Sequence, residues 1–247
     1  MRYLELALFA EGPTDYRFLS PILRRVTEDI CCQHAKQSVD VREEVLRLQT
    51  PQQERDASRA QRILAAARQD CHSYVILFIH SDSDGNWERA LKERIEPAML
   101  LLNQDAVTQQ KKTIAVIPVR ETEAWTLVDG DALRASFGIK MTNQQLGIPS
   151  KAREVEKLID PKLVLELALA KALGHRGKMK AAAFLEIISE KIELPVYVRF
   201  LLLTGLKMSS KMHLPVLGYY DEAEKNFELE AKKLATRPNL KVNYYDY

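Results

Sequence analysis

Short apolar runs alternate with longer amphipathic stretches along the first part of the chain. The clearest run covers residues 73–79 and is followed by His80, Ser81 and Asp82. It is too short for a surface helix and too apolar for a half-exposed strand, so it predicts a central strand covered on both faces. Weaker runs predict further strands over residues 3–10, 39–48 and 113–119.

The stretches between these runs carry apolar residues at helical spacing. They predict helices over residues 15–32, 52–69 and 87–102, and another that opens after Glu121. Thr14 is a suitable N-cap for the first helix, and Pro21 inside it predicts a kink or an early break. This alternation is typical of an α/β fold with a mostly parallel sheet flanked by helices.

The pattern changes near residue 140. Residues 137–149 look like a loop, and residues 150–193 predict helices broken near Pro161 and near residues 174–177. A charged helix is predicted over residues 221–235. We therefore expect an α/β domain over residues 1–140, followed over residues 141–247 by a mainly helical portion that packs as a cap on it.

Composition narrows the class of protein only slightly. The chain has 36 basic and 34 acidic side chains, so its net charge of +2 does not argue for nucleic-acid binding, and any basic surface must be local. The three cysteines lack a metal-binding spacing, which favours reduced thiols in a cytosolic protein. No apolar run approaches the ~20 residues of a membrane span, and the first residues do not resemble a signal peptide. We expect a cytoplasmic protein without a membrane segment.

Acidic side chains follow three of the predicted strands. Glu11 follows the first, Asp82 and Asp84 follow the central one, and Glu121 and Glu123 follow the strand over residues 113–119. In open α/β sheets, ligands bind outside the carboxyl ends of the strands. If the strands are parallel, all five carboxylates lie on one edge of one sheet.

Such a set of carboxylates would repel itself without a counter-ion, so a divalent cation is the natural partner. Mg²⁺ takes oxygen ligands, commonly carboxylates together with substrate phosphate. We expect Glu11, Asp82, Asp84, Glu121 and Glu123 to hold Mg²⁺ or Mn²⁺ for phosphoryl chemistry, with a glutamate left to move a proton. The alternative interpretation is a set of solvated turns and helix caps.

The order of these motifs resembles the Toprim (topoisomerase–primase) superfamily, in which one strand ends in Glu-Gly and a later strand ends in Asp-x-Asp. Here the matching residues are Glu11-Gly12 and Asp82-Ser83-Asp84. Together with residues 117–129, which contain Glu-Thr-Glu-Ala-Trp, they look like an uncharacterised Toprim-like family of bacterial defence cassettes. The resemblance covers roughly the first half of the chain.

The resemblance implies that Glu11 acts as general acid/base or metal ligand, and that Asp82 and Asp84 bind Mg²⁺. It also implies a role in antiviral defence, a separately encoded ATPase partner and assembly into a homo-oligomer. That family usually has glutamate where this chain has Asp15, so Asp15 is in doubt as a site residue.

A basic segment in the second half is the best local candidate for contact with a nucleic-acid backbone, because basic loops neutralise phosphate without selecting sequence. A solvated helix connection is an equally good interpretation of it. His80 could be a ligand, although a histidine at a strand end is more often a packing residue. The candidate backbone contacts are Lys171, His175, Arg176, Lys178 and Lys180.

These observations together predict a Mg²⁺- or Mn²⁺-dependent nuclease that hydrolyses phosphodiester bonds in DNA or RNA. Its catalytic residues would be Glu11, Asp82, Asp84 and Glu123. Two alternatives remain open: a primase-type nucleotidyl or phosphotransfer enzyme, and a non-catalytic regulatory subunit that docks on a partner through its acidic edge.

Overall fold

Parallel strands form the centre of the fold. A computed structural model describes residues 2–35, 37–118, 121–155, 157–174 and 181–194. Its larger sheet has the strand order β4-β2-β5-β6, made of β4 (Leu46–Arg47), β2 (Leu6–Phe9), β5 (Ile76–His80) and β6 (Lys112–Val116). Every neighbouring pair in this sheet is parallel. The predicted α/β fold with a mostly parallel sheet is therefore confirmed.

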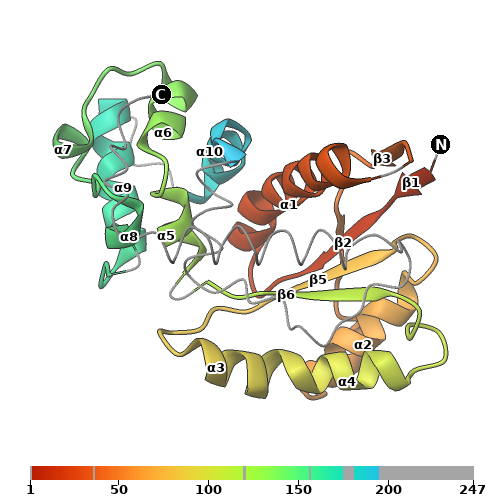
Figure 1. The fold of residues 1–247 in the computed structure, drawn as a ribbon. Coiled ribbons are helices and arrows are strands. Elements are labelled where there is room, and N and C mark those ends of the chain that lie inside the picture. Colours follow the sequence, from red (N-terminus) through yellow and green to blue (C-terminus); the bar gives the residue numbers. More distant parts are fainter. Residues whose placement is uncertain (1, 36, 119–120, 156, 175–180, 195–247) are drawn as a thin grey trace, which may run out of the picture.

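Helices cover both faces of this sheet (Figure 1). On one face lies α1 (Pro13–His34), and on the other lie α2 (Arg59–Gln69), α3 (Trp87–Ala90) and α4 (Glu96–Gln104). A π-helical turn, η2 (Leu91–Ile95), joins α3 to α4, and a 3₁₀ turn, η1 (Gln52–Glu54), precedes α2.

The central strand β5 contributes buried side chains to both faces of the sheet, so each face needs a covering layer of helices. All five residues of β5 are buried. Ile76 and Phe78 pack into the core that contains α1, whereas Leu77 and Ile79 pack into the core on the α2 and α4 side. Because successive side chains of a strand point to opposite faces, one apolar run supplies both cores. The expectation of a central strand covered on both faces is confirmed.

Two predicted strands are divided in the structure. The run over residues 3–10 splits into β1 (Arg2–Leu4) and β2, and β1 pairs in parallel with β3 (Val39–Val41) in a separate two-stranded sheet. The run over residues 39–48 likewise contains β3 and β4. Local alternation of apolar residues cannot show that one run serves two sheets.

The first helix differs from its prediction at both of the positions singled out. It begins at Pro13 with Gly12 as N-cap, and the Asp15 carboxylate accepts a hydrogen bond of 2.8 Å from the Gly12 amide, so Thr14 is not the cap. The helix also continues through Pro21, and the predicted early break is wrong. An interior proline costs about 3 kcal/mol. Phe18, Leu19 and Ile22 are fully buried on this helix, and burying each contributes about 1.5–3 kcal/mol.

The described part of the second half consists of helices. They are α5 (Thr122–Thr126), α6 (Gly130–Phe137), α7 (Asn143–Leu146), α8 (Ala152–Val155), α9 (Pro161–Leu173), η4 (Ala181–Ala183) and α10 (Leu185–Lys191). Of these, α10 and α5 pack on α1. The Arg25 guanidinium on α1 donates to the carbonyls of Ser189 and Ile192, at 2.7 and 2.8 Å. The segment 137–149, predicted as loop, contains α7.

Among the described residues, no helix has both the length and the apolar character to cross a membrane. The charged helix predicted over residues 221–235 lies outside the described residues.

Candidate active site

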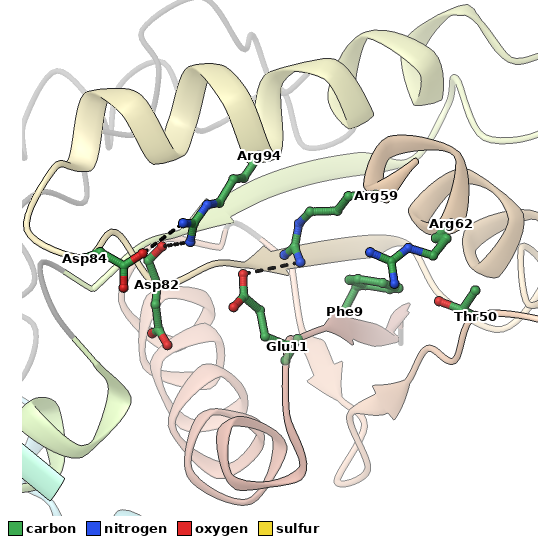
Figure 2. Close-up of a pocket in the computed structure, with 9 residues that line it drawn as sticks. Phe9, Glu11, Thr50, Arg59, Arg62, Asp82, Asp84 and Arg94 are labelled. Carbon is green, nitrogen blue, oxygen red and sulfur yellow. Dashed lines mark hydrogen bonds and ion pairs between the residues drawn. The ribbon is translucent and has the colours of Figure 1, made fainter. Parts of the chain in front are cut away.

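The three acidic connections meet at the carboxyl edge of the larger sheet. Strand β5 lies between β2 and β6, and all three are parallel, so the segments that follow them leave the same edge. Glu11, Asp82 and Asp84 line one cavity of about 590 Å³ (Figure 2). The structure thus brings together the first two of the three predicted acidic segments in a single cavity.

Glu11 is held in place from two sides. Its Oε1 accepts a hydrogen bond of 2.8 Å from the Ser81 hydroxyl and lies 3.3 Å from Arg59 Nη1. The same guanidinium donates to the backbone carbonyl of His80 at 2.7 Å. Glu11 is therefore tied to the end of β5 rather than standing on a free surface turn.

The loop after β5 is fixed by an arginine from the π-helical turn. Arg94 Nη1 donates to the carbonyl of Asp82 and its Nη2 donates to Asp84 Oδ2, both at 2.8 Å. Asp84 adopts a left-handed backbone conformation with φ of 52°. Such a φ is uncommon outside glycine, and a π-helical turn often marks a functional site.

A buried polar network lies beneath Asp82. His80 is fully buried, and its Nε2 lies 3.4 Å from Asp82 Oδ1 while its Nδ1 lies 3.8 Å from Asp15 Oδ2. Thr122 donates to Asp15 Oδ1 at 2.9 Å. Asp15 thus links α1 to the ends of β5 and β6 from inside the protein and does not line the cavity. His80 is placed to orient Asp82.

Glu121 and Glu123 stand on the β6 side of this edge. Neither lines the cavity of Glu11, Asp82 and Asp84. Burial raises the pKa of Glu121, and the charges of Asp82, Asp160 and Asp84 raise it further against the opposing Lys162. Glu121 is therefore close enough to feel the charge of Asp82, although it does not line the same cavity.

The carboxylates disfavour one another's charged forms. Burial raises the pKa of Asp82, the hydrogen bonding and charge of His80 oppose this, and the charges of Asp15 and Glu11 add to the rise. Burial also raises the pKa of Glu123, to which the charges of Glu121, Asp15 and Asp82 contribute. The carboxylates at this edge are therefore not fully compensated by the neighbouring arginines and histidine.

The donor set suits a hard divalent cation, although the ligands are not assembled around one point. Among the described residues, no three histidine, cysteine, aspartate or glutamate side chains form a group that could hold a metal ion. Within the described part of the chain, Glu121 Oε2 is nevertheless buried without a hydrogen-bond partner, and buried Asp82 Oδ1 has only the long 3.4 Å approach of His80 Nε2. Poorly paired buried oxygens in an excess of negative charge are what an oxygen-preferring cation would satisfy.

The candidate backbone-binding segment is described only in part. Lys171 lies on α9, outside the cavity, and its Nζ donates to the carbonyl of Leu146 at 3.2 Å. His175, Arg176, Lys178 and Lys180 lie outside the described residues.

Three arginines of the cavity were missed in the sequence. Arg59 and Arg62 come from α2, and Arg94 comes from η2. The spacing of Arg59 and Arg62 places them on one face of a helix, which is the only signal for them that the sequence offers. Nothing in the sequence indicates that α2 and η2 reach the carboxyl edge of the sheet.

The family described as a domain of unknown function, DUF4276, matches residues 10–199. The chain belongs to this family. No match is found among curated proteins or among solved structures. Glu11, Asp82, Asp84, Glu121 and Glu123 all lie within the matched residues, so the candidate site is part of the DUF4276 domain.

Proposed function

We propose that this protein is a nuclease that hydrolyses phosphodiester bonds in DNA or RNA with the help of Mg²⁺ or Mn²⁺. The observation that carries the proposal is the composition of one cavity. Glu11, Asp82 and Asp84 face Arg59, Arg62 and Arg94 across it. Carboxylates beside guanidinium groups suit a substrate that is an anion and reacts at phosphorus.

Asp82 would be the central ligand of the cation, with Asp84 and Glu11 on the cavity side and Glu121 on the β6 side. A bound divalent cation would neutralise the phosphate and polarise it toward attack. Two buried carboxylate oxygens would be available to it: Glu121 Oε2, which has no hydrogen-bond partner among the described residues, and Asp82 Oδ1, which has only the 3.4 Å approach of His80 Nε2.

Glu123 is the candidate for moving a proton. Burial and then neighbouring carboxylates raise its pKa, the direction that suits a general acid/base, and it would act from the β6 side because it does not line the cavity. Glu11, held by Ser81 and Arg59, is better suited to hold a fixed position. His80 would keep Asp82 in place from below.

The wider biological role follows from the Toprim resemblance alone. A defence effector that works with a separately encoded ATPase would have such a site, and its activity would then depend on that partner. The link of Glu11-Gly12 and Asp82-Ser83-Asp84 to Toprim proteins stays a prediction.

Cleavage by the purified protein tests the proposal. Supercoiled plasmid, linear duplex, single-stranded DNA and total tRNA would be incubated with wild type and with Asp82→Asn, in Mg²⁺ and in Mn²⁺. Cleavage of any of these by wild type and not by the variant supports the proposal. Equal cleavage by both proteins, or none by either, contradicts it for the isolated chain.

A further inference from the structure

The cavity extends well beyond the carboxylates. Figure 2 shows Asp82 and Asp84 with Arg94 at one end, Glu11 and Arg59 in the middle, and Arg62 with Thr50 at the far end. Phe9 lies beneath Arg59 and Arg62, with the Arg59 guanidinium 5.8 Å from the centre of its ring. The cavity therefore has one end with two carboxylates and Arg94, which we call the acidic end, and one end with Arg62 and, among the described residues, no carboxylate, which we call the basic end.

The three arginines differ in how far the protein already uses them. Arg94 bonds to the Asp82 carbonyl and to Asp84, and Arg59 bonds to the His80 carbonyl and approaches Glu11. The Arg62 guanidinium makes no hydrogen bond and no ion pair with any described residue, and the buried Nε atoms of both Arg59 and Arg62 lack a partner. Arg62 is the least satisfied of the three.

Placing a second guanidinium beside Arg59 has an electrostatic cost. Arg59, Arg62 and Arg94 all line this one cavity, and among the described residues only Arg59 and Arg94 have carboxylate partners in it. Arginines that repel one another inside a cavity are stabilised when an anion binds between them. The planar guanidinium presents paired donors that match phosphate oxygens.

We propose that Arg62, Arg59 and Thr50 form a binding subsite for the phosphate that neighbours the reacting one, so that the cavity takes a polynucleotide chain rather than an isolated phosphate ester. The inference rests on the proposed function, because it takes the acidic end as the place of reaction. If the reacting phosphate lies at the acidic end, the next phosphate along the same chain would lie toward the basic end.

Binding without chemistry tests this subsite. A short fluorescein-labelled oligothymidylate and the matching oligouridylate would be titrated with the full chain in EDTA, and affinity would be followed by fluorescence anisotropy over a range of salt. Arg62→Gln is expected to weaken binding about tenfold and to reduce the salt slope by roughly 0.7, as for the loss of one phosphate contact on a single strand.

Two further variants define the contact. Arg55→Gln removes an exposed arginine that directly follows η1, precedes α2 and does not line the cavity, and it should bind like wild type. Arg62→Lys keeps the charge but loses the paired donors, so it should restore the salt slope and only part of the affinity. Circular dichroism and melting temperature would confirm that each variant folds.

Several results would overturn the proposal. These are an Arg62→Gln protein with the affinity and salt slope of wild type, a wild type that binds neither oligonucleotide, and inorganic phosphate competing as well as an unlabelled oligonucleotide. Failure of hydrolysis is a separate outcome. If no substrate is cut while Arg62-dependent binding persists, hydrolysis by the isolated chain is rejected and the subsite stands as a polynucleotide-binding site.

Discussion

An aspartate at each edge of the larger sheet has its pKa shifted, and the two shifts have opposite directions. At the amino edge, where chain segments lead into β5 and β6, Asp105 accepts bonds from Arg68 Nε at 2.9 Å, from the Thr108 amide at 3.1 Å and from the Val107 amide at 3.2 Å. The Arg68 hydrogen bond is the main cause that lowers the pKa of Asp105 to about 2. At the carboxyl edge, burial and like charges raise the pKa of Asp82.

The difference separates a charge that the fold itself satisfies from one that it leaves poorly satisfied. Asp105 is fully paired and stabilises the turn between α4 and β6. Asp82 has a buried oxygen that, in the described part of the chain, has only the 3.4 Å approach of His80 Nε2, and its neighbours include Glu11 and Asp15. Strain of this kind persists at sites where another interaction is expected to relieve it.

The largest effect should distinguish the two aspartates by activity. Asp82→Asn is expected to slow nucleic-acid cleavage about 100-fold or more, the scale for losing one preorganised electrostatic group in an active site. Asp105→Asn should cut at the wild-type rate, measured as initial rates well below both melting temperatures. A comparable loss in both variants would mean that Asp82 acts through stability alone.

The arginines of the two edges give a smaller contrast in rate. Arg94→Gln loses the bonds to the Asp82 carbonyl and to Asp84. We expect cleavage to fall roughly tenfold, which corresponds to about 1.4 kcal/mol of barrier. Arg68→Gln removes only the partner of Asp105, so its rate should not change. An unchanged rate in Arg94→Gln would show that the loop holds its position without this arginine.

The same pair of aspartates should have opposite effects on stability. Asp82→Asn removes a disfavoured charge and should raise the melting temperature by about 3 °C, corresponding to a gain on the order of 1 kcal/mol. Asp105→Asn removes a charge that accepts hydrogen bonds from Arg68 and from two backbone amides, and it should lower the melting temperature. Thermal unfolding of metal-free protein at neutral pH measures both. A lower melting temperature for Asp82→Asn would contradict the electrostatic account.

Lowering the pH should abolish the effects of Asp82→Asn and Asp105→Asn on the melting temperature in a fixed order. The folded state binds a proton to Asp82 more tightly than the unfolded chain does, so the cost of its charge disappears as pH falls toward the ordinary aspartate pKa of about 3.9. Asp105 has the opposite shift, and its stabilising charge is lost only between about pH 4 and its folded pKa of about 2. Melting temperatures across this range should show the Asp82→Asn gain vanish first.

The carboxyl edge could be predicted because its signals are local. Each acidic segment directly follows an apolar run, and parallel strands bring such ends together whatever the rest of the chain does. Glu11, Asp82 and Asp84 were found in this way. The rule predicts which residues lie at the edge but not which of them line the cavity. It therefore included Glu121 and Glu123, which lie on the β6 side of Asp82 and outside the cavity.

The arginines could not be predicted for a physical reason. Arg59 and Arg62 begin a helix and Arg94 lies in a π-helical turn, so each has the sequence context of a solvated surface residue. Only tertiary packing of α2 and η2 over the sheet turns them toward the carboxylates. Likewise, α1 continues through Pro21 because buried neighbours outweigh a local rule that favours a break.

Titration calorimetry with Mn²⁺ tests the central claim most directly, because it asks whether the carboxyl edge holds a divalent cation before any substrate is known. Wild type, Asp82→Asn and Asp105→Asn would be compared at neutral pH. We predict that wild type and Asp105→Asn bind with the same affinity and that Asp82→Asn binds at least about tenfold more weakly, a difference of about 1.4 kcal/mol. Equal affinities for wild type and Asp82→Asn, or no binding by wild type, would contradict it.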